Sequence, residues 1–237
     1  MEPWEIKEDD TRKVDTQRVF IIFCEDSAIE PAYFNMFKHE GIRLSTHGNT
    51  KQHHAQVDHT TEFFSDKDLL EIKNGKEVLK IDDGTQVWCV FDRDKEPNDR
   101  KDNAFNDSIQ NANEKGIQTA WSNDDFELWV LLHFEDIDPN DTDYSNRTKY
   151  YERLTDILKQ QYPNEAKFQH ANFDYYKTMK SKKNFIYYTY LKMKDNIEIA
   201  ITRAEKLESH HNTPNSQPPH LQCPCTRVHH LVKELRK

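Results

Sequence analysis

The sequence predicts an α/β fold: a parallel sheet flanked by helices, followed by a helical C-terminal part. Two observations predict it. Over the first 135 residues, short runs of β-branched and aromatic residues alternate with helical patterns. This alternation is typical of parallel strands connected by helices. Residues 147–237, by contrast, show helical patterns only.

Three apolar runs predict strands, at residues 18–23, 86–91 and 117–121. The first two contain hardly any polar residues, as expected for strands that are buried on both faces. Residues 46–85 are less informative, and we expect a helix over 55–73 and a turn at 82–84.

Five further helices are expected, three in the first part of the chain and two in the C-terminal part. Pro31 is well placed in the first turn of one helix, and Gly116 fits the C-cap of another around 104–115. Residues 122–125 are typical of an N-cap before an apolar helix over 126–134. In the C-terminal part, residues 184–208 form the longest candidate helix, 209–226 a proline-rich loop and 228–235 a short terminal helix.

These elements suggest three parts: a flexible N-terminal arm over 1–17, an α/β core over 18–145 and a helical part over 146–237 packed on the core. No apolar run approaches the roughly 18 residues of a membrane span, and no leader-like segment opens the chain. Four cysteines are too few for a disulfide scaffold of 237 residues. We therefore expect a cytoplasmic protein without membrane contact, and the sequence leaves its oligomeric state open.

The net charge of −9 is unevenly distributed. Residues 1–144 contain 16 Lys and Arg against 33 Asp and Glu, a net charge of −17, whereas residues 145–194 contain 11 against 4, a net charge of +7. The acidic first part repels a polyanion. Contact with nucleic acid would therefore require bound cations, the basic segment or a partner protein.

Acidic residues follow two of the predicted strands. Glu25 lies two residues after the first strand, and Asp92 and Asp94 come directly after the second. Because ligands of parallel sheets bind outside the carboxyl ends of the strands, we expect these groups at one edge, with Asp92 and Asp94 pointing the same way. Oxygen ligands of this kind suit Mg²⁺ or Mn²⁺ and phosphoryl-transfer chemistry. The alternative is that Asp-x-Asp is an ordinary loop composition.

Five segments resemble the RloB family: FIIFCE at 20–25, EPAYF at 30–34, VWCVFDRD at 87–94, SNDDFELWVLLHF at 122–134 and CTRVHHLV at 225–232. The resemblance covers residues 18–237. It implies a Toprim-like core, similar to the catalytic domains of topoisomerases and primases. It also implies a Mg²⁺- or Mn²⁺-dependent nuclease that cleaves phosphodiesters of RNA or DNA. The resemblance further implies a role as the effector of a bacterial anti-phage abortive-infection system, often beside an ATPase of the AAA or ABC type.

The resemblance also assigns roles by position. It implies catalytic roles for Glu25, Asp92, Asp94 and Glu127, and metal binding for Glu25, Glu30, Asp92 and Asp94. Asp26 stands where such loops usually have Gly, which keeps an alternative open: a catalytically weak or inactive Toprim-like scaffold or sensor subunit that binds a partner ATPase.

Two other groups of residues are candidates for binding. Tyrosines interleave with a basic run, which suits phosphate contact and base stacking, although a solvated helix face is the alternative. The Cys and His residues over 210–230 do not match zinc-ligand spacing, so we interpret that segment as a polar connection. His133 is expected to be a core histidine. The basic run consists of Lys177, Lys180, Lys182 and Lys183.

Overall fold

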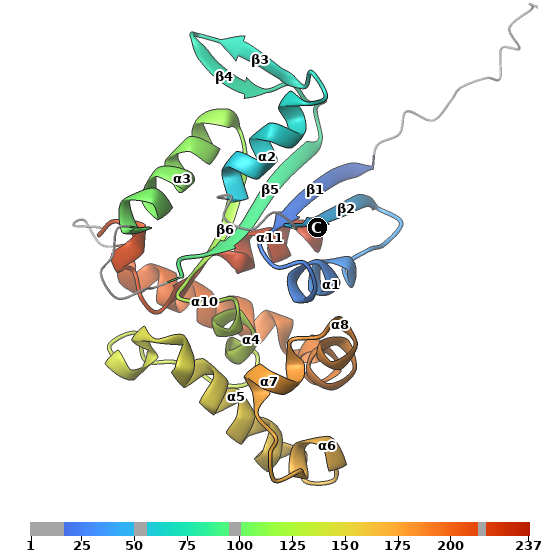
Figure 1. Ribbon diagram of the computed structural model, residues 1–237, viewed down its shortest axis with the longest axis vertical. Helices are drawn as coiled ribbons and strands as arrows, with labels where there is room; N and C mark the ends of the chain where they lie inside the picture. Colours follow the sequence, from blue (N-terminus) through green and yellow to red (C-terminus); the bar gives the residue numbers. More distant parts are fainter. Residues whose placement is uncertain (1–16, 50–55, 95–100, 213–216) are drawn as a thin grey trace, which may run out of the picture.

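A computed structural model describes residues 17–49, 56–94, 101–212 and 217–237. A five-stranded sheet in the order β2-β1-β5-β6-β7 forms its centre, with β1, β2, β5 and β6 mutually parallel and β7 antiparallel to β6 (Figure 1). The predicted α/β class, with its helical C-terminal part, is thereby confirmed. The sheet strands are β1 (Arg18–Cys24), β2 (Ile42–Gly48), β5 (Thr85–Asp92), β6 (Gln118–Asn123) and β7 (Cys225–Thr226).

Side chains of the central strands alternate between two apolar cores, one on each face of the sheet. On one face, Phe23 of β1 and Cys89 of β5 pack with α2 (Gln56–Ser65) and α3 (Lys101–Lys115). On the other face, Ile22 and Val90 join a larger core with α1 (Ile29–Asn35), α4 (Glu127–Leu132) and the C-terminal helices. Burial on both faces explains the continuous apolar runs of β1 and β5.

The C-terminal half is largely helical, as predicted, and Figure 1 shows much of it on the side of the sheet toward which β5 runs. The predicted helix over 184–208 is part of a helical run that changes its winding several times between Lys182 and His211. The elements are a 3-10 turn (Thr142–Ser145), α5 (Arg147–Gln161), α6 (Ala166–Gln169), α7 (Tyr175–Met179), α8 (Lys182–Asn184), a π-helical segment (Phe185–Tyr190), α9 (Leu191–Met193), a 3-10 turn (Lys194–Asn196), α10 (Ile197–His211), a 3-10 turn (Pro219–Leu221) and α11 (Val228–Leu235).

Several elements differ from the sequence-based predictions. The helix expected over 55–73 ends at Ser65, and an antiparallel hairpin of β3 (Leu70–Lys73) and β4 (Lys76–Leu79) follows. The N-cap predicted over 122–125 is correct only in part: Ser122 and Asn123 belong to β6, whereas the Asp125 carboxylate accepts from Glu127 N at 3.2 Å, where α4 begins. The expectation of helices alone after residue 147 missed β7.

The C-terminal segment returns to the sheet. Arg227 N donates to Trp121 O at 2.7 Å, next to the β6–β7 pairing, and α11 buries its apolar side completely. Arg18, at the start of β1, forms an ion pair of 2.6 Å with Glu234 of α11.

Except for Gln17, the predicted N-terminal arm lies outside the described residues. In the described part of the chain, no helix has the length and apolar character needed to cross a membrane.

Candidate metal centre

Glu25 and Asp92 meet at the carboxyl edge of the sheet, as the sequence predicts. Cys24, the last residue of β1, pairs with Val90 of the parallel strand β5, which continues two residues further to Asp92. Glu25 Oε2 accepts a hydrogen bond of 2.8 Å from Asp92 N. Glu25 keeps an exposed surface at the edge of the site, and partial desolvation of its carboxyl group raises its pKa to about 7. The hydrogen bond from Asp92 N opposes that rise.

Asp92 is the central acid of the site. Its Oδ2 accepts a hydrogen bond of 3.1 Å from Phe126 N, whereas its buried Oδ1 has no hydrogen-bond partner among the residues that the structure describes. Burial raises the pKa of Asp92 well above its usual value, and the charges of Asp125 and Glu30 add to the effect. A buried carboxylate oxygen without a donor is costly, so this atom is suited to receive a cation.

Two further glutamates, Glu30 and Glu127, are almost completely buried here, each with 2% of its surface exposed. Glu30 Oε2 accepts from Asp26 N at 3.1 Å, and Glu127 Oε1 lies 2.9 Å from Lys180 Nζ. Burial is the largest cause that raises the pKa of each glutamate, and neighbouring carboxylates raise it further. The site thus concentrates negative charge where water cannot solvate it.

Asp26 has a structural role in the loop after β1. Its carboxylate accepts from Ala28 N at 2.8 Å and from Ile29 N at 2.7 Å, at the start of α1. These bonds satisfy amide groups that a helix start otherwise leaves unpaired. Among the described residues, positive φ angles outside glycine occur at three other positions, so Asp26 does not need the conformational freedom of Gly. Gly48, rather than residue 26, permits close packing here, since a Cβ on it would lie 2.6 Å from Ser27 Cα.

Asp94 occupies the rim of the site. Its φ of 50° lies in the left-handed region, and β5 has already ended at Asp92. Asp92 and Asp94 were expected to point the same way because alternate residues of an extended strand do so. Asp94 lies outside the strand, so this expectation does not hold. The Asp94 carboxylate, half exposed, forms an ion pair of 2.9 Å with Arg147.

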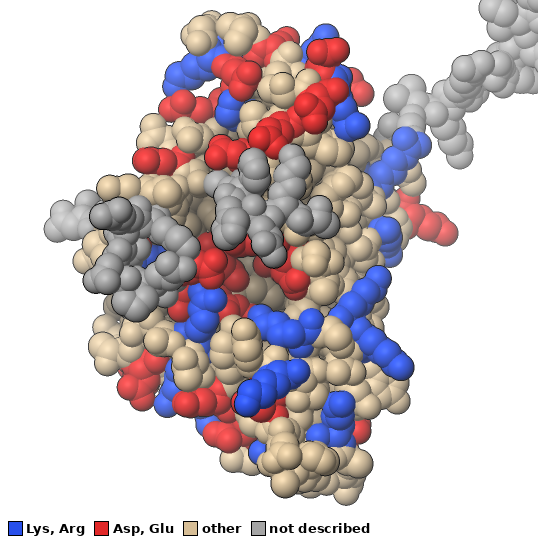
Figure 2. Space-filling model, in the orientation of Figure 1, with Lys and Arg blue, Asp and Glu red and all other residues tan. Residues whose placement is uncertain are grey.

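Two basic side chains from the helical part neutralise part of the acidic charge. Arg147, at the start of α5, forms ion pairs with Asp124 at 2.7 Å and with Asp125 at 3.4 Å as well as with Asp94. Tyr151, one turn further along α5, donates its hydroxyl to Asp125. The Arg147, Tyr151 and Lys180 interactions are among those that lower the pKa of Asp125 despite its burial. Figure 2 shows acidic side chains in the middle of this face and basic ones below them.

The acids and the cations enclose a small pocket. Its volume is about 150 Å³, and its walls include Glu30, Asp92, Asp125 and Glu127, with Arg147 and Lys180. Its oxygen donors suit Mg²⁺ or Mn²⁺, and the unpartnered Asp92 Oδ1 supports that fit. Among the described residues, no three of these carboxylates bring oxygens within 4.8 Å of one another. Side chains would therefore have to move inward for a single ion to take three of them.

The sequence did not indicate the contacts of Arg147, Tyr151 and Asp125. Arg147 lies 22 positions or more from the acids that it pairs with, and no local pattern marks it. Of the basic run, Lys180 reaches the acidic pocket, and its ammonium also lies over the rings of Tyr151 and Tyr176. The other members of the run, Lys177, Lys182 and Lys183, are exposed.

A comparison with protein families agrees with these motifs. A family model described as RloB-like protein matches residues 20–235, which is most of the chain. Searches of curated proteins and of solved structures returned no match. The matched span contains every acidic residue of the site, both basic residues that face it and the returning segment of β7 and α11. The chain therefore belongs to the RloB-like protein family.

Proposed function

We propose that this protein is a divalent-metal-dependent nuclease with a Toprim-like core that cleaves phosphodiesters of RNA or DNA. One observation carries the proposal: Asp92, whose buried Oδ1 has no partner among the described residues, meets Glu25 and the two buried glutamates Glu30 and Glu127 at the edge where parallel sheets bind ligands. Glu25, Glu30, Asp92 and Glu127 would hold Mg²⁺ or Mn²⁺. The bound ion would neutralise phosphate charge and activate the attacking water.

The residues of this chain have separate tasks in that chemistry. Arg147 and Lys180 place two positive charges at the wall of the pocket, where they would hold the phosphate oxygens of a substrate. Glu25 would share the ion with Asp92, and the hydrogen bond from Asp92 N would hold its carboxylate in position. Asp94, at the rim, would keep Arg147 in position.

The biological role follows from the family resemblance. As an RloB-like protein, the chain would act as the effector of a bacterial anti-phage abortive-infection system, beside an ATPase of the AAA or ABC type. If cleavage requires that ATPase, the isolated protein would bind metal without turning over substrate, so metal binding is the more direct readout.

The test compares the wild type with Glu25→Gln/Asp92→Asn on labelled RNA and DNA, with Mg²⁺, Mn²⁺ or EDTA. Asp136→Asn is the matched control, since Asp136 is an exposed acid paired with Lys206 outside the pocket. We expect Mn²⁺ binding by calorimetry and metal-dependent cleavage in the wild type and the control, and neither in the double variant. Equal metal-dependent cleavage by the double variant would refute the proposal.

A second candidate function is a scaffold or sensor subunit without catalysis that binds the partner ATPase. It is favoured by the basic groups: Arg147 and Lys180 already pair with the carboxylates, and no three described carboxylates are close enough to share an ion. Absence of Mn²⁺ binding at millimolar metal, in a folded wild type, would favour this function over the nuclease.

A further inference from the structure

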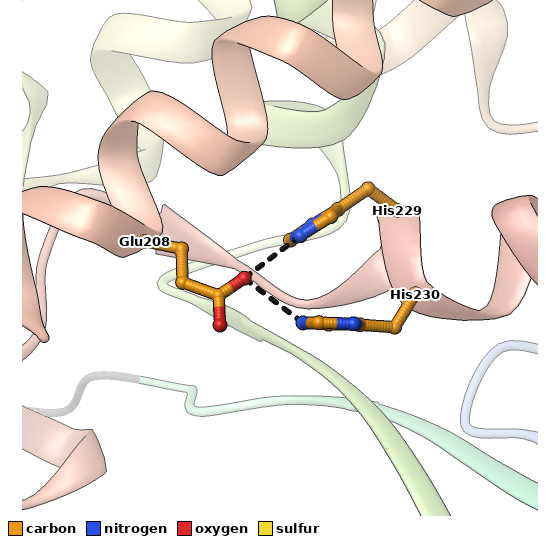
Figure 3. A group of neighbouring side chains, drawn as sticks. All are labelled: Glu208, His229 and His230. Atoms are coloured by element: carbon orange, nitrogen blue, oxygen red, sulfur yellow. Dashed lines mark hydrogen bonds and ion pairs between the residues drawn. The ribbon is translucent and has the colours of Figure 1, made fainter.

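A second cluster of potential ligands lies between α10 and α11, remote from the acidic pocket in the fold. Glu208 Oε2 is 2.8 Å from His229 Nε2 and 2.9 Å from His230 Nε2, and Figure 3 shows both rings directed at this one oxygen. Within the described part of the chain, this is the one group of at least three His, Cys, Asp or Glu side chains whose ligand atoms all lie within 4.8 Å of one another.

The hydrogen bond of His229 Nδ1 makes the contact between His229 Nε2 and Glu208 a contact between two acceptors when the ring is neutral. His229 Nδ1 lies 3.1 Å from Thr226 O, and a carbonyl oxygen only accepts, so this nitrogen carries the hydrogen. In a neutral ring Nε2 then bears a lone pair, which faces the Glu208 carboxylate. Two acceptors at 2.8 Å repel unless a positive species lies between them. A metal ion placed there would use the lone pairs of both atoms.

The donor set is typical of zinc. Two imidazole nitrogens and one carboxylate oxygen form a known three-ligand set for Zn²⁺, with a fourth position open to water or substrate. Two of the three ligands are also held by outer contacts: His229 by Thr226 O, and Glu208 by the ion pair of its Oε1 with Arg227. Outer contacts of this kind orient metal ligands and tune their affinity.

The cluster has an open side. His230 and Arg227 line a pocket of about 750 Å³ together with Trp88, Gln222 and Glu234. An ion held by three ligands could therefore take its fourth ligand from this pocket. From these observations we propose that Glu208, His229 and His230 bind one transition-metal ion of the zinc class, which joins α10 to α11 and faces the pocket.

The spacing along the chain gave no sign of this site. The sequence-based search for zinc ligands over 210–230 did not include Glu208, which comes from the preceding helix. The Cys residues of that stretch, Cys223 and Cys225, are not members of the cluster. Only the packing of α11 against α10 brings the three ligands together.

The test uses the full-length chain without an affinity tag, titrated with Zn²⁺ by calorimetry and with Co²⁺ by visible absorption. We expect one equivalent of each at this site, besides any ion at the acidic pocket, with the intense absorption of four-coordinate Co²⁺. His230→Ala should weaken zinc binding at least about 100-fold, since loss of an outer-shell contact alone costs 10–100-fold. His210→Ala is the control, because His210 is exposed and outside the cluster.

Two further variants make the result unambiguous. His230→Gln serves if His230→Ala proves unstable, and circular dichroism checks the fold of both. Asp92→Asn should retain the Co²⁺ absorption, so that failure of the acidic centre and failure of this site are distinguished. Absence of Zn²⁺ binding by the folded wild type, or equal binding by the His230 variants, would overturn the proposal.

Discussion

At the scale of single residues, the site is defined by an imbalance of charge around Asp92. Its Oδ1 is buried and has no partner among the described residues. The negative charges of Glu25, Glu30 and Glu127 raise the pKa of Asp92 further. Lys180 and Arg147 compensate part of this charge by reaching in from the helical part. The same two cations would compete with a metal ion for the carboxylates.

Removal of Lys180 tests that competition. Lys180→Met abolishes the 2.9 Å ion pair with Glu127 and leaves its carboxylate free for a divalent ion. We expect Mn²⁺ affinity, measured by calorimetry, to rise about fivefold, which corresponds to roughly 1 kcal/mol of relieved charge repulsion in a partly solvated site. Lys182→Met is the control, since Lys182 is exposed and is not among the residues of the pocket wall. Unchanged or weaker binding by Lys180→Met would contradict this account.

His133 gives the molecule a dependence on pH that is separate from the metal centre. Its Nδ1 bonds to Trp129 O at 2.9 Å, its Nε2 is buried without a partner, and burial lowers its pKa from 6.5 to about 4. As the pH falls from about 6.5 to 4, the unfolded chain takes up a proton that the folded protein does not, so the free energy of unfolding decreases.

The expected loss through His133 is up to about 3 kcal/mol across that range, from 1.36 kcal/mol for each unit of pKa difference. His133→Gln, which cannot become charged, should lose less stability between pH 7 and pH 4. Urea unfolding of both proteins at several pH values gives the comparison, and the difference between the curves isolates this residue from other histidines. Parallel curves would show that His133 is not the neutral buried group described above.

At the scale of elements, the predicted strands were those whose residues are buried on both faces. The continuous apolar runs of β1 and β5 follow directly from their central positions, and Glu25 and Asp92 could be predicted as neighbours from the strand ends alone. The edge strand β2 was missed because it has a polar, half-exposed sequence.

The hairpin β3–β4 did carry a local signal. Asn74 and Gly75 connect the two strands, with φ angles of 53° and 77°, as a type I′ turn requires. Lys180 was predicted as basic and surface-lying, but its contact with Glu127 depends on the packing of the whole helical part against the sheet. Long-range contacts of this kind leave no periodic trace in a sequence.

Gly116 provides a test at the level of one helix. It follows the last residue of α3 with a φ of 79°, and Ile117 N bonds back to Ala112 O at 2.9 Å. Gly116→Ala forces a side chain into this left-handed position, and we expect a loss of about 1 kcal/mol in unfolding free energy by urea denaturation. Asn111→Ala, on the exposed side of the same helix, should change it little. An equal effect of both substitutions would contradict the predicted C-cap.

At the scale of the whole molecule, different parts of the chain supply the acidic and the basic groups of the site. The acidic edge comes from the first part of the chain, whereas the basic groups that face it come from residues 145–194, whose net charge is +7. The segment from β7 to α11 then returns to the sheet and ties the helical part to β6 and β1. A nucleic acid would approach the acids across this basic part.

The exposed lysines of the basic run test that route. Lys177→Ala/Lys182→Ala/Lys183→Ala should weaken binding of single-stranded RNA and reduce the slope of log affinity against log salt by up to about 2, at roughly 0.7 for each lost phosphate contact. Mn²⁺ binding should be unchanged, because the three lysines do not line the acidic pocket. An unchanged salt slope would exclude this surface from nucleic-acid binding.

The central claim, that the acids at the carboxyl edge of the sheet bind a divalent cation, is tested most directly by anomalous diffraction from crystals of the wild-type protein soaked in Mn²⁺. The account predicts an anomalous peak in direct contact with carboxylate oxygens of Asp92 and Glu25, distinct from any ion at Glu208 and His229. No peak there at millimolar Mn²⁺, with Lys180 still paired to Glu127, would contradict it.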